Sequence, residues 1–211
     1  DYEARHPDVR RSASYGKPAE PLLRMARMLR VLDLPPPLAH AGDHRLFLNL
    51  QWSMPEQAPL LASSVFNFFQ PGFSNPGPIA QAGLLSPEFQ IFAETTAIRQ
   101  ANRHFESMSW GIWTPEPDGA GGRAVVRFDF TPYVALLNTP GLPPQEAQDK
   151  MIDRLNERLL FGTMSPALRH DIHSAFAALP TWFDYSTDRQ TWRVRIAAYL
   201  IFISPEFFVQ R

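Results

Sequence analysis

The sequence predicts a mainly α-helical fold: an irregular bundle of about six or seven helices with long proline-rich loops and at most one short hairpin. One observation is that apolar residues recur at the 3.6-residue helical period in several separate stretches. Another is that the chain has 21 prolines, about twice the ordinary share, which suits helices linked by stiff loops. A third is that a single short stretch alternates apolar and polar residues as a strand does.

We expect a single domain, because 211 residues are enough to bury a sizeable core. Residues 1–18 are polar and are expected to be irregular. Residues 19–113 are expected to form the N-terminal helices, an aromatic loop and a long helix. A flexible loop with a possible strand follows over 114–130, and the C-terminal helices occupy 131–211.

The composition narrows the class of protein. Hydrophobic residues make up 45% of the chain and charged residues 19%, which predicts a globular chain and not a disordered one. Twenty basic residues stand against 21 acidic ones, so the chain lacks the basic surplus of a nucleic-acid-binding protein. There is no cysteine, which excludes disulfides, thiol catalysis and cysteine-ligated metals, and we expect no cofactor.

The sequence given contains no signal for export or membrane insertion. Residues 1–11 are charged and lack the apolar centre of a signal peptide, so an export signal would have to lie upstream. The longest apolar run, residues 196–203, is far shorter than the ~20 residues that a membrane-spanning helix needs. We therefore expect no transmembrane segment in this chain.

The first predicted helix covers residues 20–32 and is amphipathic. Leu22, Leu23, Met25 and Met28 are expected to face inward, whereas Arg24, Arg27 and Arg30 are expected to form a solvated face or a set of salt bridges to the rest of the protein. An anion-binding role for that arginine row is the alternative. Residues 35–37, three prolines, end the helix, and residues 45–52 are expected to form a short helix.

The central stretch pairs an aromatic loop with a long helix. Ser86 and Pro87 suit the cap and the first position of a helix, which then runs to about Trp110 without glycine or proline. Residues 65–78 before it are rich in phenylalanine, proline and glycine. We expect this loop to be rigid and to pack its rings onto the core, because exposed rings would form a large apolar patch. A platform that presents the rings to a ligand is the alternative.

The remaining elements are predicted from the hydrophobic periodicity and from the glycines and prolines that interrupt it. Residues 114–123 hold three glycines and two prolines and are expected to be flexible, and residues 123–130 alternate as a weak strand that needs a partner. Helices are predicted over 131–137, 143–161, 167–179 and from Thr187 or Asp188 to 203, with a short turn from Ser204. The helix ending at 203 is apolar nearly all round, which predicts a central, buried position.

Glu94 is the strongest candidate for acid–base chemistry, because its neighbours on the predicted long helix are small or apolar. A carboxylate in such surroundings needs a partner or has a function. Asn67, Arg99 and Asn102 are candidate partners, and together with Phe69 and Phe73 they are the candidate ligand-binding residues. The competing interpretation makes Glu94 a structural hydrogen-bonding centre.

Other constellations are weaker. His170 and His173 lie one helical turn apart, but no third metal ligand is apparent, and the usual zinc helix has histidines four residues apart. Trp110, Trp113, Trp182 and Trp192 are candidates for sugar stacking, although tryptophan in a helical protein more often lies in a core or an interface. The sequence has neither a Gly-x-Ser-x-Gly nucleophile motif nor a phosphate-binding glycine loop.

Several short motifs spread over nearly the whole chain form one recognisable set: residues 2–5, 16–18, 20–21, 62–71, 76–78, 82–84, 87–95, 164–166, 193–195 and 204–211. Through these motifs the chain resembles the large bacterial family catalogued as domain of unknown function 1800. It implies that this chain is the C-terminal portion of a longer protein in an exported setting, periplasmic or at the cell surface. It implies frequent pairing with another exported family, but no activity and no catalytic residue.

The absence of a catalytic signature favours a non-enzymatic role. We expect a helical scaffold or interaction module that docks to its own N-terminal region or to another protein subunit. One alternative is a hydrolase or glycan-active site that uses Glu94 beside the aromatic loop. A second alternative is a helical domain that carries a cofactor or ligand.

Overall fold

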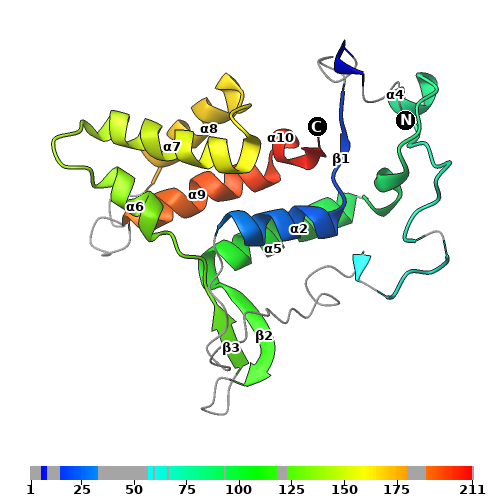
Figure 1. Cartoon of the computed structure of the whole chain (residues 1–211), viewed down its shortest axis with the longest axis horizontal. Coiled ribbons are helices and arrows are strands. Elements are labelled where there is room, and N and C mark those ends of the chain that lie inside the picture. Colours follow the sequence, from blue (N-terminus) through cyan, green and yellow to red (C-terminus); the bar gives the residue numbers. More distant parts are fainter. Residues whose placement is uncertain are drawn as a thin grey trace.

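The computed structural model describes residues 6–8, 15–32, 57–58, 60–65, 67–92, 94–117, 123–179 and 189–210. The chain is mainly α-helical, as predicted (Figure 1). Within these ranges no helix combines the length and apolar character that crossing a bilayer requires. The expected short helix over 45–52 lies outside the described residues, as do the prolines 35–37, Phe66, Trp182 and the glycines of 119–122.

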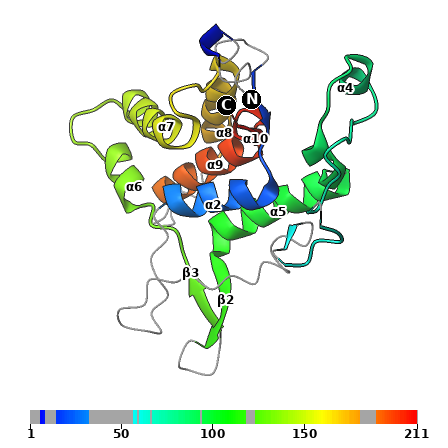
Figure 2. The ribbon, with the colours of Figure 1, turned by 45° about the vertical axis from the view of Figure 1, so that its right-hand side comes forward.

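The centre of the helical body is α9 (Arg189–Ile203). It contacts α5, α6, α7, α8 and α10, and Figures 1 and 2 show it crossing between them. Val194, Ala197, Ala198 and Ile201 are completely buried. The prediction of a central helix is confirmed, because a helix that is apolar on most sides is stable only when neighbours cover those sides.

The other C-terminal helices pack around α9: α6 (Thr131–Leu137), α7 (Pro144–Leu160), α8 (Pro166–Ala177) and α10 (Pro205–Phe208). The predicted apolar stripe of α7 is buried in full, namely Ala147, Met151, Ile152, Leu155, Leu159 and Leu160. Ser165 and Ser204 cap α8 and α10, since their Oγ atoms accept the N–H groups of Leu168 and Phe207. The carboxylate of Glu206 also accepts the N–H of Ser165 at 3.0 Å, which ties the start of α8 to α10.

The first predicted helix is α2 (Pro21–Val31), but its arginine row is not solvated as expected. Arg24 is only 6% exposed, and Arg27 donates a hydrogen bond to the carbonyl oxygen of Leu159 on α7. Arg30 is exposed, and so is Leu23, which was expected to face inward. The prediction was wrong because α2 is covered on two sides, so its polar stripe also meets neighbours.

The predicted long helix is divided into two parts. A 3₁₀ turn, η3 (Pro87–Ile91), is followed by non-helical Phe92 and then by α5 (Glu94–Trp110). Phe92 lies at φ −106°, ψ 79°, and its ring packs 4.7 Å from the ring of Phe208. Tertiary packing of the rings therefore interrupts a stretch that local propensity alone would continue as a helix.

Two small sheets are present in the part of the chain that the structure describes. The strand predicted over 123–130 is shorter, β3 (Arg123–Val126), and pairs antiparallel with β2 (Ile112–Pro117), so a hairpin occupies part of the expected flexible loop. Gly111 turns the chain from α5 into β2 at φ +88°, where glycine is favoured. The second sheet joins β1 (Lys17–Pro18) to β4 (Val209–Gln210), which brings the two ends of the described chain together.

Residues 60–85, here called the arm, extend away from the helical body and include the short helix α4 (Pro78–Gln81) (Figure 2). None of the described arm residues is buried. The arm bonds to itself and to the following turn: the Ser86 N–H donates to the Phe73 carbonyl oxygen at 2.8 Å, and the Gln70 N–H to Gln90 Oε1 at 2.7 Å. The expectation that its aromatic rings pack onto the core is therefore wrong.

Candidate functional site

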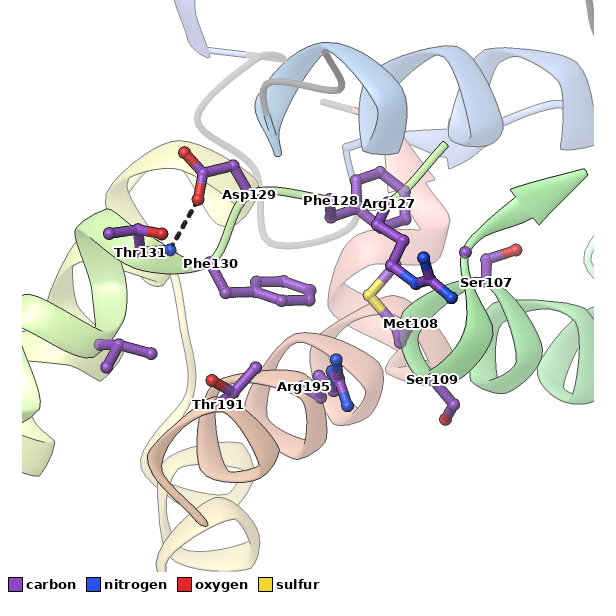
Figure 3. Close-up of a pocket in the computed structure, with 12 residues that line it drawn as sticks. Ser107, Met108, Ser109, Arg127, Phe128, Asp129, Phe130, Thr131, Thr191 and Arg195 are labelled. Carbon is purple, nitrogen blue, oxygen red and sulfur yellow. Dashed lines mark hydrogen bonds between the residues drawn. The ribbon is translucent and has the colours of Figure 1, made fainter. Parts of the chain in front are cut away.

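A cavity of about 270 Å³ lies where the end of α5 meets the segment after β3, the first turn of α6 and the middle of α9 (Figure 3). Its inner wall is apolar, because Met108, Phe128 and Phe130 are buried and Val134 adds a further aliphatic group. Its other lining residues are polar or glycine: Ser107, Ser109, Gly111, Arg127, Asp129, Thr131, Thr191 and Arg195. An apolar wall with a few converging polar groups is the usual make-up of a small-molecule site.

Two arginines supply the positive charge of the cavity. Arg195 comes from α9, and its guanidinium stacks 4.9 Å from the Trp192 ring and 6.0 Å from the Phe130 ring. Arg127 comes from the segment after β3, and its stem lies against Gly111, where a Cβ atom would approach the Arg127 Cγ to 2.9 Å. Figure 3 shows the Arg127 guanidinium beside the last turn of α5, and the Arg195 side chain on α9.

Asp129 is the acidic residue of the lining, and its carboxylate is occupied elsewhere. The Thr131 N–H donates to Asp129 Oδ1 at 2.9 Å at the start of α6. Figure 3 shows the carboxylate turned toward Thr131 and away from both arginines. Hydrogen bonds from the side chain and backbone of Thr131 lower the pKa of Asp129, so it stays ionised for that contact.

A second polar cluster, the polar seam of Arg24, Gln100 and His104, is buried between α2 and α5. Arg24 donates to Gln100 Oε1, and its guanidinium lies 4.8 Å from the Phe92 ring centre and 4.7 Å from that of Phe208. Burial lowers the pKa of Arg24 to about 10. Burial, and then the charge of Arg24, lower the pKa of His104 to about 4, so the imidazole is neutral at pH 7.

Apolar side chains are exposed along the arm and on the outer side of α5. Val65 is 95% exposed and Leu85 is 65% exposed, with Leu60, Leu61 and Leu84 similarly uncovered. On α5 the exposed apolar residues are Ile98, Phe105 and Trp110. The arm contains no aspartate, glutamate, lysine, arginine or histidine, so its exposed surface is neutral as well as apolar.

The structure does not gather the predicted ligand-binding residues into a cavity. Glu94 lies exposed in the first turn of α5, with no ion pair among the described residues, so the expectation of an apolar environment for it is wrong. Arg99 and Asn102 are exposed on the same helix, and Asn67 is exposed on the arm. Phe69 and Phe73 are half-buried in the arm. None of these residues lines the cavity in Figure 3.

The two candidate metal ligands have different surroundings. His173 Nε2 lies 3.0 Å from Asp149 Oδ1 on α7, and its Nδ1 lies 3.3 Å from Gln145 Nε2. His170 is exposed and lies near the Ser174 hydroxyl, at 3.5 Å. In the described part of the chain no group of three or more His, Cys, Asp or Glu side chains is arranged to hold a metal ion.

The sequence prediction misses Arg127 and Arg195 as site residues. Arg127 belongs to the strand-like alternation and Arg195 to an apolar helix, and neither pattern says which residues share a cavity. The usable signal is Gly111 between a helix and a strand, because an abrupt reversal there folds Arg127 back onto the end of α5.

Comparison with known proteins places the whole described body in one family. The model of the family described as "Protein of unknown function (DUF1800)" matches residues 3–209. The chain belongs to this family. No curated protein and no solved structure matches the chain. Membership of DUF1800 thus covers the arm, the polar seam and the cavity alike, and it assigns a role to none of them.

Proposed function

We propose that this DUF1800 chain is a helical interaction module whose arm docks onto another folded polypeptide region. The observation that carries the proposal is that the whole described arm lacks a buried residue, although it is rich in leucine and phenylalanine. Monomeric proteins rarely leave large contiguous apolar patches uncovered, and such patches mark interaction sites. The exposed apolar residues at the arm's two ends, Leu61 and Leu85, therefore suit an interface.

The chemistry of the arm favours a protein partner. The cores of protein interfaces are depleted in charge and enriched in aromatic residues, and the arm has no charged side chain and several phenylalanines. A nucleic acid would call for lysine and arginine. A membrane surface would call for a long amphipathic helix with basic residues, whereas α4 spans only Pro78–Gln81.

The partner is either the chain's own N-terminal region, in the longer protein that the family resemblance implies, or a separate subunit. Both would bury the arm, and the exposed Ile98 of α5 is a further candidate for the same interface. The same resemblance is our reason for proposing an exported setting, periplasmic or at the cell surface. Fractionation of cells that express the complete gene product from its own start tests that setting.

The alternatives have less support. The hydrolase alternative needs a concave site that contains Glu94 and a tryptophan, and the cavity in Figure 3 is lined by neither. Glu94 and Trp110 also stand at opposite ends of α5, about 24 Å apart at a rise of 1.5 Å per residue. The ligand-carrying alternative is supported only by the cavity in Figure 3.

Native mass spectrometry tests the docking proposal. The 24.0 kDa chain is co-expressed with the rest of its gene product as a separate polypeptide, and a complex of fixed stoichiometry is expected. The double change Leu84→Ser and Leu85→Ser is expected to weaken that complex at least tenfold, because each buried leucine contributes about 1.5–3 kcal/mol. A lone monomer in every preparation would contradict the proposal.

The control is Trp113→Thr, which removes a comparably exposed apolar residue from the β2–β3 hairpin, away from the arm. The complex is expected to tolerate this change. If instead a separate subunit co-purifies and the rest of the gene product does not, the partner is intermolecular. If Trp113→Thr weakens the complex as much as the double change Leu84→Ser and Leu85→Ser does, the arm is not the docking surface.

A further inference from the structure

We infer that the cavity beside the end of α5 binds a small uncharged molecule with one aromatic ring and one hydroxyl group, a molecule of the phenol type. None of the described residues that line the cavity belongs to the arm, so the inference goes beyond the docking role proposed above. The volume of about 270 Å³ is just below the ~300–1,000 Å³ range of most ligand pockets, which suits a ligand with a single ring.

The buried wall of the cavity favours an aromatic ring. Phe128 and Phe130 are both buried, and their ring centres lie 6.1 Å apart. Met108 lines the same cavity and is only 3% exposed. Aromatic pairs gain more free energy than the burial of their area alone provides, and a thioether makes favourable contacts with ring edges. A flat ring that enters the cavity therefore meets partners that favour it over an aliphatic body of the same size.

The charged groups of the lining favour an uncharged ligand. Arg195 is already engaged by this chain, because its guanidinium stacks on two aromatic rings and has a further interaction, so we assign it no ligand contact. The Asp129 carboxylate accepts the Thr131 N–H at 2.9 Å. Arg127 and Asp129 are both exposed and opposite in charge, so they give the open side no net charge. A charged ligand would lose hydration beside the apolar wall without a charge reserved for it.

Arg127 supplies the open side of the cavity with a second group that favours an aromatic ring. Its stem lies against Gly111, where a Cβ atom would approach the Arg127 Cγ to 2.9 Å. In Figure 3 its guanidinium lies beside the last turn of α5. A guanidinium stacks favourably on the face of a ring. The ligand ring would thus lie between this guanidinium and the buried wall.

The hydroxyl groups of Ser107 and Thr191 provide the polar contact for the ligand. Both residues line the cavity and are half-buried, Ser107 on α5 and Thr191 on α9. A hydroxyl group can both donate and accept a hydrogen bond, so either residue can pair with a hydroxyl on the ligand. That pairing replaces the water which the ligand hydroxyl gives up on entering the cavity. The ligand class is therefore a phenol and not a ring without a polar group.

Phenol and cyclohexanol test the inference on the intact 24.0 kDa chain, because they share size and hydroxyl group and differ in the aromatic ring. Phenol, like a tyrosine side chain, is uncharged at pH 7. Titration followed by NMR is expected to show saturable binding of phenol, with ring-current shifts of the Met108 and Val134 methyl signals. The methyl signal of Met151, which is buried in α7 and does not line the cavity, is expected to stay unchanged. Cyclohexanol is expected to bind about threefold more weakly or less.

Two variants separate the ring contact from the hydrogen bond. Arg127→Leu is expected to raise the phenol dissociation constant about threefold and to change that of cyclohexanol by less than about twofold, because it removes a contact that only a ring can make. The double change Ser107→Ala and Thr191→Val is expected to raise the phenol dissociation constant about fivefold. The same double change is expected to alter the affinity for toluene, which has no hydroxyl group, by less than about twofold.

The matched control is Arg30→Leu, since Arg30 is an exposed arginine on α2 and does not line the cavity. It is expected to leave the phenol dissociation constant unchanged, and circular dichroism with a thermal midpoint checks the fold of each variant. Any one of four results would overturn the inference: no saturable phenol binding up to about 10 mM, equal binding of phenol and cyclohexanol, equal effects of Arg127→Leu and Arg30→Leu, or unchanged phenol binding in the double variant.

Discussion

The C-terminal helices and the arm use similar residues with opposite results. In α7, α8 and α9 most of the large apolar side chains are buried within the chain itself; Leu155, Ile172 and Ile201, for example, have no exposed surface. In the arm Val65 and Leu84 are exposed, and Phe69 and Phe73 are only half-buried. The C-terminal helices therefore form a core among themselves, whereas the arm has the apolar composition of a buried segment but no buried residue among those that the structure describes.

The border between the two regions is α5, whose amphipathicity is partly reversed. Its buried side carries Thr96, Gln100 and His104 as well as Met108, whereas Ile98 is exposed and Phe105, whose ring packs against Tyr199 of α9, is partly exposed. A helix that packs only against its own chain would bury its apolar residues and expose its polar residues. The reversal is consistent with a helix that packs on the core through the polar seam and offers its outer side to a partner.

The largest expected contrast comes from truncating one leucine in each region. Leu155→Ala in the core is expected to lower the free energy of unfolding by about 2–5 kcal/mol, because it leaves a cavity among fully buried neighbours. Leu84→Ala in the arm is expected to change it by less than about 0.5 kcal/mol. Urea denaturation followed by circular dichroism measures both, and comparable losses in the two variants would erase the distinction between the regions.

The polar seam makes stability depend on pH. The pKa of His104 is about 4 in the folded chain and near its ordinary 6.5 after unfolding. Between these values the unfolded chain binds the extra proton, so the free energy of unfolding falls as pH decreases from about 6.5 to about 4, by roughly 3 kcal/mol. His104→Gln is expected to flatten this part of the profile relative to wild type.

The control for His104 is the exposed His170, and His170→Gln is expected to keep the wild-type dependence on pH. Urea midpoints measured at several pH values between 4 and 7 give the comparison. If the stability of wild type and of His104→Gln depends on pH in the same way, the polar seam is open to water. The side of α5 that carries the seam would then be exposed, as the arm is.

A smaller effect is expected at the junction between α5 and the hairpin. Gly111→Ala combines a positive φ with a Cβ atom 2.6 Å from the Val126 carbonyl oxygen, and is expected to cost roughly 1–3 kcal/mol. Gly83→Ala in the arm also has a positive φ, but its Cβ atom would meet nothing within 4 Å. Thermal unfolding of the two variants separates the cost of the positive φ from the cost of the steric contact. The loss of stability is expected to be smaller for Gly83→Ala.

How far the sequence predicts the fold is clearest at two identical tetrapeptides. Ser204 begins the sequence Ser-Pro-Glu-Phe and caps α10, as the local pattern predicts. Ser86 begins the same four letters, but its Oγ accepts the N–H of Asn75 at 2.8 Å, and only the 3₁₀ turn η3 follows. Local signals predicted the helices that pack on their own neighbours, namely α6 to α10 and α2. They failed where a distant segment takes the hydrogen bond that would cap a helix, as Asn75 does at Ser86.

The candidate sites were harder to predict for the same reason. Periodicity identified which residues of α7 and α9 are buried, because an apolar stripe is a property of one helix. Arg24, Arg127 and Arg195 depend on contacts with other elements: the rings of Phe92 and Phe208, the turn at Gly111, and the ring of Phe130. No local pattern encodes such contacts, and so Arg24 was expected to be solvated and the cavity was not foreseen.

The docking of the arm is tested most directly by hydrogen exchange of its backbone amides, measured by mass spectrometry. Peptides that cover residues 60–85 are compared in the chain alone and in the complete gene product, with peptides of α7 (Pro144–Leu160) as the internal reference. The arm is expected to exchange rapidly in the chain alone and to become strongly protected when its partner is present, while α7 stays protected in both. Rapid exchange of the arm in both preparations would contradict the proposal that another polypeptide region covers it.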